Sequence, residues 1–389
     1  MMRTLAIGTS AGPEPADRNL MPRASSPRAV EIDGIRGWAS LIVLLFHAFR
    51  EMLRGIVPQV DSPLLAPLFA SDLAVAVFFV LSGDALSLSF FHSGQPGAID
   101  RLVVRRYFRL TVPILMSCLV TYLIMIAGLD YHFEAAQILG NQSWLDRFLH
   151  FSPSLYECLK YSLMKVYVAH TTDLSYNPFL WTMSIEMIGS MLVFLACYLW
   201  SRLKSGEQVC IYLVVGLTAL GSFFSLFFAG LLFSHWRQRG VFERLLASRR
   251  HQYIALLATA SCVAVYVLAG GLNSTHEVVH RLLTPILSIA LVFCAYTQRR
   301  LKAFFSCAAS RFLGVISFPV YLLQFQVLIS LMSWLAVRDY AANHQLERGA
   351  LLGFAAITVA VTIAAAWVFS KVERLALTTI DRHVLRILK

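Results

Sequence analysis

Long apolar runs, separated by short polar and basic stretches, recur along nearly the whole chain after residue 35. A helix needs about 20 residues to cross the roughly 30 Å hydrocarbon layer of a bilayer, and nine runs approach that length. A backbone exposed to lipid must satisfy its own hydrogen bonds, so helices carry such a fold. The pattern predicts an all-α fold, a polytopic membrane helix bundle, with spans near 37–54, 71–91, 110–128, 179–200, 209–233, 253–270, 282–297, 312–335 and 350–370.

Basic residues gather between the apolar runs and indicate an orientation. The N-terminal tail and the connections at 92–109, 234–252 and 298–311 all carry arginine clusters. We expect these segments to be cytoplasmic, because cytoplasmic loops of membrane proteins are rich in Lys and Arg. The same distribution accounts for the formal net charge of +11 without a nucleic-acid partner. The sequence therefore predicts a multi-pass protein of the cell inner (plasma) membrane with both termini cytoplasmic.

Nine crossings do not fit this charge map, because a single fifth span would put the basic 234–252 loop outside. One further crossing is expected. It is either a hairpin within 209–233, where Gly221 and Gly230 permit a tight reversal, or the stretch 155–170. The second location needs three charged side chains near membrane depth, which is costly. Either choice gives about ten transmembrane helices.

Composition agrees with a lipid environment and narrows the chemistry. Of 389 residues, 58% are hydrophobic and 14% charged, and the mean hydropathy is +0.65. The seven cysteines lie mostly inside apolar runs without a CxxC pair, which indicates core residues rather than disulfides or a metal site. Residues 1–30 hold four arginines but no apolar core. They fail as a secretory signal and are expected to form a disordered cytoplasmic tail.

The segment EIDGIRGWASLIVLLFHAFR, residues 31–50, holds the first candidate site. Eleven helical steps of about 100° bring Arg36 and His47 onto one face, about 16 Å apart along the axis. Ionisable residues within a span are scarce and usually face a cavity or a partner. Imidazole exchanges protons near neutral pH, which suits His47 to general-base chemistry. The alternative is a neutral histidine hydrogen-bonded between helices.

Two further runs carry polar residues among apolar ones. In NPFLWTMSIEMIGS, Glu186 has no charged neighbour in its run, so it must be protonated or find a partner, with His47 or an arginine as candidates. In FFVLSG, Ser82 and Gly83 by themselves indicate close helix packing. Asp84, which follows, either pairs with a cytoplasmic arginine or lies at the interface.

Three arginines precede the third span in RLVVRRYFRLTVP. Arg105 and Arg109 are four residues apart and share a helical face, with Arg106 between them. The positive-inside rule accounts for such arginines in most membrane proteins, but guanidinium groups on one face also bind phosphate. Both interpretations stay open here. Near the C-terminus, Glu373 has basic neighbours and indicates a structural ion pair.

In sequence order these motifs resemble the acyltransferase family 3 membrane proteins, which acylate sugars of envelope polysaccharides, nodulation factors and antibiotics. DGIRG, with ten residues between Arg36 and His47, matches the arginine and histidine motif of the family, FFVLSG is a near-verbatim match, and LWTMSIE resembles LWSLSVE. The chain departs from the family at MIGS after Glu186, at Gln324 where many members have histidine, and at Leu375 in place of proline. The resemblance assigns 31–375 to an acyltransferase 3 transmembrane domain, followed by a short cytoplasmic tail at 376–389.

The resemblance implies an O-acyltransferase whose donor is acyl-coenzyme A, acetyl-coenzyme A above all, entering from the cytoplasm as a co-substrate. No bound cofactor or metal is implied. The implied donor-binding residues are Arg105, Arg106, Arg109 and Ser82. In the implied catalytic group, His47 acts on the thioester or the acceptor hydroxyl, Glu186 orients or charge-balances His47, and Arg36 stabilises negative charge near the thioester. Transfer is either direct or through a covalent histidine intermediate.

The acceptor implied by the resemblance is a hydroxyl of a carbohydrate or glycolipid, with a secondary-metabolite hydroxyl as the alternative and membrane lipid as the surrounding partner. Two other classes of protein fit the same residues. A proton-coupled secondary transporter also combines about ten spans with an intramembrane histidine and carboxylate, although no two-half repeat is visible. A non-catalytic scaffold or sensor would use the polar residues only to hold helices together.

Overall fold

The computed structural model describes residues 30–93, 99–271 and 277–387, and every regular element within these ranges is helical. The all-α fold is thereby confirmed for the described part of the chain. The predicted N-terminal tail lies outside it, except for Val30, which begins the first helix.

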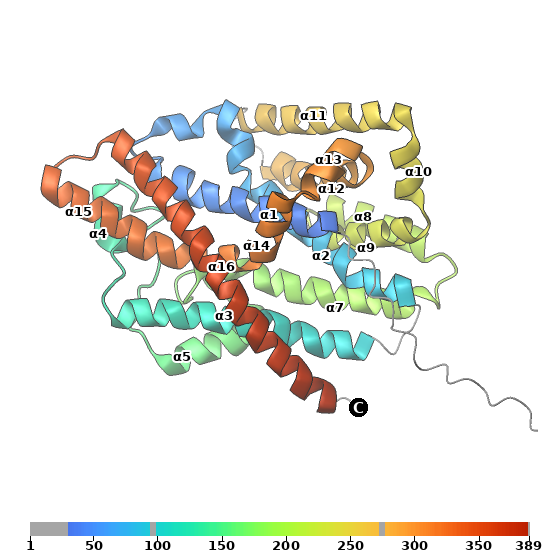
Figure 1. Cartoon of the computed structure of the whole chain (residues 1–389), viewed down its shortest axis with the longest axis horizontal. Helices are drawn as coiled ribbons and strands as arrows, with labels where there is room; N and C mark the ends of the chain where they lie inside the picture. The colour runs from blue at the N-terminus through green and yellow to red at the C-terminus, as the bar shows by residue number, and fades with distance from the viewer. Residues whose placement is uncertain (1–29, 94–98, 272–276, 388–389) are drawn as a thin grey trace, which may run out of the picture.

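The α-helices form a bundle in which most of the long ones lie along the long axis of the molecule (Figure 1). They are α1 Val30–Leu45, α2 Ser71–Ser93, α3 Ile99–Ile126, α4 His132–Ile138, α5 Leu155–Lys160, α6 Val166–Val168, α7 Thr182–Trp200, α8 Gly206–Ala219, α9 Phe224–Gln238, α10 Val241–Ala247, α11 Arg249–Gly271, α12 Glu277–Thr297, α13 Arg299–Phe305, α14 Ala308–Val327, α15 Ser333–Asn343 and α16 Arg348–Ile387. Short π and 3-10 segments complete them: η1 Phe46–Glu51, η2 Pro58–Asp61, η3 Pro63–Phe69, η5 Tyr161–Lys165, η6 Pro178–Trp181 and η7 Leu328–Met332.

In the described residues, seven helical segments are long and apolar enough to cross a membrane. An eighth results if the pair Arg281–Thr297 and Arg299–Phe305, bent by 93°, counts as one span. The prediction of about ten spans is therefore not confirmed. The seven segments are Val30–Glu51, Pro63–His92, Val103–Ile126, Pro178–Trp200, Arg249–Ala269, Ala308–Asn343 and Arg348–Ile380.

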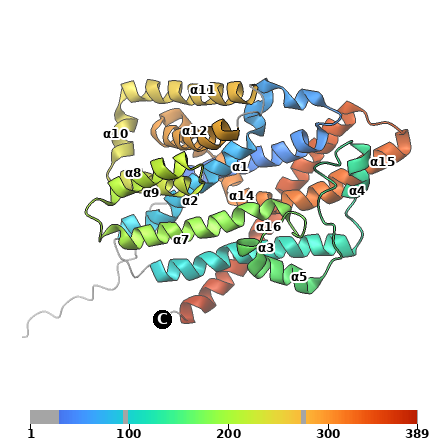
Figure 2. The same cartoon turned by 180° about the vertical axis from the view of Figure 1, so that it is seen from behind.

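The predicted span at 209–233 is wrong as a single helix. The chain reverses after α8 at Gly221, whose φ of +67° is easily adopted only by a residue without a Cβ atom. The two helices α8 and α9 then pack against each other, as Figures 1 and 2 both show. With 14 and 15 residues, each is shorter than the length needed to cross a bilayer. A reversal at Gly221 was expected if residues 209–233 formed a hairpin.

Glycines bring two pairs of helices into backbone contact. A methyl group added to Gly37 of α1 would collide with the backbone of Gly314 in α14. On α9, a methyl group at Gly230 would collide with the carbonyl oxygen of Val80, and one at Gly83 of α2 would collide with the backbone of α9. Small residues allow this close approach, which replaces the hydrophobic driving force that is missing between helices in lipid. The glycine of FFVLSG thus packs helices, as its type predicted.

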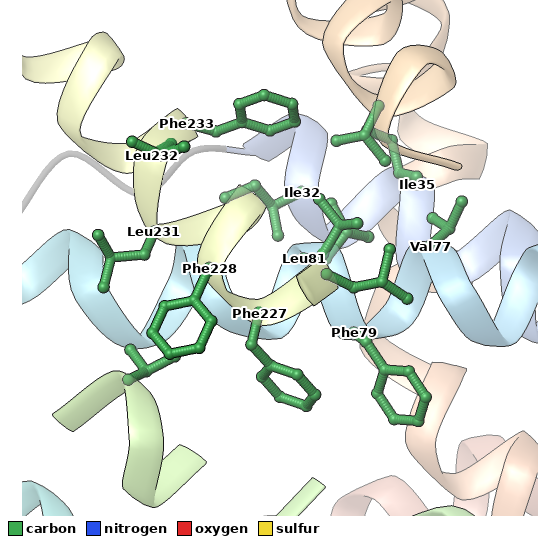
Figure 3. Close-up of a cluster of buried hydrophobic side chains, with 14 of the residues drawn as sticks. Ile32, Ile35, Val77, Phe79, Leu81, Phe227, Phe228, Leu231, Leu232 and Phe233 are labelled. Atoms are coloured by element: carbon green, nitrogen blue, oxygen red, sulfur yellow. The ribbon is translucent and has the colours of Figure 1, made fainter. Parts of the chain in front are cut away.

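Apolar side chains fill the space around these contacts. Figure 3 shows Phe79 and Leu81 of α2 against Phe227 of α9, with Ile32 and Ile35 of α1 next to them. All five are buried. Such side chains gain close van der Waals contacts, which help to drive helix association in lipid. The helix α2 is therefore packed on several sides, and its polar residues are held in fixed directions.

The start of α1 lies with α10 and α13 at one end of the bundle, here named the basic end. There Lys302 Nζ lies 3.4 Å from Glu31 Oε1. Arg299 Nε donates a hydrogen bond of 2.7 Å to the carbonyl oxygen of Leu246. The basic connections 234–252 and 298–311 therefore meet at the same end.

Residues 129–154 cover the opposite end of α1 and are named the outer cover. Asn141 Nδ2 donates a hydrogen bond of 2.6 Å to the carbonyl oxygen of Glu51. Leu145 and Phe148 of the cover share a buried apolar cluster with Met52, just beyond η1. The helix α4, which belongs to the cover, lies far from α10 in both Figures 1 and 2.

Gly230→Ala tests the backbone contact between α2 and α9. We expect it to lower the free energy of unfolding by about 1–3 kcal/mol or more, because the methyl group forces α9 away from Val80. Gly353→Ala is the matched control, since no atom lies within 4 Å of the added methyl group. It should be neutral or stabilising by up to about 1 kcal/mol. Unfolding of the two purified variants in detergent gives the comparison, and equal losses would contradict the contact.

Candidate active site

His47 lies on η1, the π-helical segment that continues α1. The first apolar span runs Val30–Glu51 rather than 37–54, so His47 lies four residues before its end. The span expected at 37–54 would have put His47 near its middle, and the structure puts it nearer the end, because the helix begins seven residues earlier than the apolar run. Short π segments inside helices occur frequently at functional sites.

One amide and three aromatic rings surround the imidazole of His47. Its Nδ1 lies 3.1 Å from Oε1 of Gln324 on α14. The ring of Phe179 stacks on it with a centroid distance of 4.0 Å and an interplanar angle of 8°. Trp144 of the outer cover lies nearly parallel at 6.0 Å, and Phe46 contacts the ring edge. The backbone of Val43, one turn earlier on α1, also lies within hydrogen-bonding reach of the ring. Nε2 is not one of the buried side-chain atoms left unpaired among the described residues.

The carboxylate of Glu186 is the centre of a second, charged cluster. Ser82 Oγ donates a hydrogen bond of 2.6 Å to Glu186 Oε1. Arg106 forms an ion pair with the same oxygen, and its Nε donates a hydrogen bond of 2.9 Å to Ser190 Oγ. Ser190 in turn donates to the carbonyl oxygen of Glu186. Three helices, α2, α3 and α7, are joined through this carboxylate.

Arg36 completes the charged cluster from α1. One of its terminal nitrogens lies 3.4 Å from the carbonyl oxygen of Leu81, next to Ser82. It interacts electrostatically with Glu186 and Arg106. The structure thus gathers four predicted site residues into one cluster. Glu186 binds an arginine, the second of the two predicted partners, and forms no hydrogen bond with His47.

The three arginines of α3 do not act as one set. Arg106 turns inward to Glu186, while Arg105 and Arg109 are exposed on the helix surface. Arg109 interacts electrostatically with Glu373 of α16, which also feels Arg374. The basic groups that act on Glu373 therefore include a residue far away in the sequence, and the structural ion pair itself stays a prediction. Arg105 and Arg109 are left as the surface pair on the predicted shared face.

Asp84 is paired with an arginine of the basic 234–252 segment, the first of its two predicted alternatives. Both of its carboxylate oxygens accept hydrogen bonds from Arg237 of α9, at 3.0 and 2.9 Å. Tyr296 of α12 donates a further bond of 2.7 Å. Asp84 is fully buried, so this ion pair is structural. The expected arginine came from α9 rather than from the neighbouring connection.

Tyr321 of α14 ties the stacking partner of His47 to the same helix as Gln324. Its hydroxyl donates to the carbonyl oxygen of Phe179 and lies 2.7 Å from Thr182 Oγ1. Phe179 is thereby held where it stacks on His47. The signal available in the sequence was a pair of polar residues, Tyr321 and Gln324, inside an apolar run. In the described residues, no group of three His, Cys, Asp or Glu side chains is placed to hold a metal ion.

Residues 30–371 match the acyltransferase domain that defines the acyltransferase 3 family. The chain belongs to this family. The acyltransferase clz18 of Cochliobolus lunatus is 23% identical over 437 residues, covering 88% of this chain and 92% of that protein. No solved structure matches the chain. The resemblance drawn from the motifs is confirmed, and the two clusters lie within the matched acyltransferase domain.

Arg106→Met tests the buried ion pair of this acyltransferase. We expect the free energy of unfolding to fall by about 3–5 kcal/mol, because the carboxylate of Glu186 is left buried without its counter-charge. Arg105→Met is the matched control, since it removes the exposed neighbour, and it should cost less than about 0.5 kcal/mol. Adding Glu186→Gln to Arg106→Met should recover most of the loss. Denaturant unfolding in detergent measures all four proteins, and equal effects of the two arginine variants would refute the pairing.

Acidification should loosen the outer cover. Burial lowers the pKa of His132, whose Nε2 donates to the carbonyl oxygen of Phe148 at 3.1 Å and whose Nδ1 is buried without a partner. Asp130 and Glu134 lie near enough to oppose this effect in part. Below about pH 6.5 the unfolded cover binds a proton more readily than the folded one, so stability falls by up to about 1.4 kcal/mol per pH unit.

Hydrogen exchange of the 129–154 peptides, corrected for intrinsic rates, checks this expectation at about pH 7.5 and about pH 5.5. Protection should fall at the lower pH in the wild type and change less in His132→Phe. Equal protection of the wild type at both values would show that His132 does not carry the effect.

Proposed function

We propose that this protein transfers an acyl group, acetyl in the first instance, from acyl-coenzyme A to a hydroxyl group of a carbohydrate or other small-molecule acceptor. Membership of the acyltransferase 3 family supports acyl transfer. The observation that carries the assignment of the site is the imidazole of His47, whose Nδ1 is hydrogen-bonded to the amide of Gln324 and whose ring face stacks on Phe179.

In this proposal His47 Nε2 accepts the proton of the acceptor hydroxyl as the oxygen attacks the thioester carbonyl carbon. The carbon–sulfur bond then breaks, and the acyl group stays on the acceptor oxygen. The coenzyme A thiolate takes the proton back from the imidazolium, so His47 returns to its starting form. A general base in this position contributes typically about 10²–10⁴-fold to the rate.

In this proposal the donor binds at the basic end. We assign its phosphates to Arg105 and Arg109, because both side chains are exposed at the beginning of α3 and share one face. Arg106 and Ser82 hold Glu186, which supports Arg36. Arg36 lies about 16 Å from His47 along the helix axis. A donor bound at the arginines would extend its pantetheine arm along α1 toward His47, past the positive charge of Arg36.

This placement requires the basic end to face the cytoplasm, where acyl-coenzyme A is available. Both termini are then cytoplasmic, and the outer cover with Trp144 faces the opposite side of the plasma membrane. The acceptor would approach His47 from the cover. A carbohydrate or glycolipid hydroxyl is our first proposal for it, and a secondary-metabolite hydroxyl is the alternative.

Purified protein in nanodiscs, supplied with radiolabelled acetyl-coenzyme A, tests the proposal. We expect slow donor hydrolysis without an acceptor and labelled product when a suitable acceptor is added. His47→Ala should reduce both rates by about 10²–10⁴-fold, because the proton acceptor is lost. His92→Ala, at the exposed end of α2, is the matched control and should retain activity. Substrate uptake into vesicles without thioester cleavage would point instead to a transporter.

A further inference from the structure

The amide of Gln324 can take only one orientation in its buried position. Its Nε2 lies 3.2 Å from the carbonyl oxygen of Tyr321, which accepts hydrogen bonds and cannot donate them. The amide nitrogen must therefore face Tyr321, and the amide oxygen must face His47 Nδ1 at 3.1 Å. An amide oxygen also only accepts. The proton of the neutral imidazole must then lie on Nδ1, and the lone pair on Nε2.

We propose that Gln324 is a positioning residue that holds His47 in the Nδ1–H tautomer and leaves Nε2 as the reactive nitrogen. The inference rests on the proposed function of His47 as the base. Gln324 is fully buried and contacts no reacting atom in this scheme. It acts through the proton position and the direction of the imidazole ring.

The helix α14 supplies two restraints on the ring of His47 from adjacent turns. Gln324 fixes the edge that carries Nδ1, and Tyr321 holds the carbonyl oxygen of Phe179, which stacks on the ring face. An edge contact and a face contact together define the plane and the rotation of the imidazole. Nε2 then points away from α14.

The register of α1 against α14 fixes this arrangement. Gly37 touches Gly314, and His47 contacts Gln324, so both pairs are separated by 277 positions in the sequence. Equal separations mean that the two helices run parallel and stay in step over ten residues, about 15 Å. A slip of one helical turn, about 5.4 Å, would take the amide out of reach of the imidazole.

The proposed role of Gln324 also depends on its side chain being uncharged. A carboxylate in its place would also accept from Nδ1–H, but it would stabilise the imidazolium once the proton is taken up. The proton would then be returned less readily to the leaving thiolate. An amide supports the neutral base without this penalty.

Gln324→Leu removes the acceptor, and Gln324→Glu keeps an acceptor but adds charge. We expect Gln324→Leu to lower kcat by about 10- to 100-fold with KM for acetyl-coenzyme A changed less than about twofold, because an unset tautomer affects the chemical step rather than donor binding. Gln324→Glu should retain more activity than Gln324→Leu. The acidic limb of its pH–rate profile should move to higher pH, since the carboxylate favours the protonated ring.

Gln326→Leu is the matched control. Gln326 is buried on the same helix two residues away, and its Nε2 binds Ser117 and Thr121 rather than His47. The variant removes an equally buried amide, so it reports the loss of stability without the loss of positioning. It should melt at a lower temperature, while kcat per folded molecule and the pH–rate profile stay those of the wild type.

The tautomer itself is visible without any assay of activity. In ¹⁵N-histidine spectra, the signals that disappear in His47→Asn belong to His47. We expect one protonated Nδ1 and one unprotonated Nε2 in the wild type, and a mixture of tautomers in Gln324→Leu. A wild type without transferase activity but with this spectrum would refute the proposed function alone. Normal kcat in folded Gln324→Leu, or a protonated Nε2 in the neutral wild-type ring, would overturn the role of Gln324.

Discussion

A charge buried in an apolar bundle requires an opposite charge or hydrogen bonds, and this constraint orders the helices around α2. Ser82 and Asp84 of α2 are two positions apart and therefore point in nearly opposite directions. Ser82 binds Glu186 of α7, and Asp84 binds Arg237 of α9. Rotating or sliding α2 would break the hydrogen bond of Ser82 to Glu186 and leave Asp84 unpaired, and the second change alone costs several kcal/mol. The glycine between the two residues, Gly83, lets α9 approach closely enough for the second pair to form.

The pairing of Glu186 with Arg106 leaves His47 among uncharged neighbours. Its contacts with Gln324, Phe179 and Trp144 are an amide and two aromatic rings. A nearby carboxylate favours the imidazolium, whereas a low-dielectric setting without an opposite charge favours the neutral ring. Only the neutral ring removes a proton from a hydroxyl. The separation of the Glu186 carboxylate from the imidazole of His47 thus agrees with the proposed chemistry. The sequence alone had also allowed a direct pairing of Glu186 with His47.

The lengths of the apolar runs and the distribution of charge predicted the helical fold class, because both are properties of single segments. A long apolar segment in lipid must form its backbone hydrogen bonds within itself. They did not locate helix ends, since the span with His47 begins at Val30 inside a polar stretch. The binding partners of the charged residues were harder still to predict from the sequence. Arg106 and Glu186 are 80 positions apart, and their meeting depends on how α3 docks beside α7. Residue type alone marked both as members of a site, because a charged group in an apolar run is costly unless it has a partner or a function. The partner of His47 was visible only as a polar residue in an apolar run.

The parallel pair α1 and α14 connects the two clusters mechanically. Gly37, next to Arg36, allows α1 to touch α14 near the basic end, and the same register places Gln324 beside His47 about three turns further along. Bulkier residues at Gly37 or Gly314 would separate the helices, and the hydrogen bond of 3.1 Å at the far end would open with them. A substitution at Gly37, next to Arg36, would therefore affect His47 without touching it. Gly37 and His47 on α1 are ten residues apart, as are Gly314 and Gln324 on α14. The spacing of these residues on α1 therefore marks the face along which α1 contacts α14.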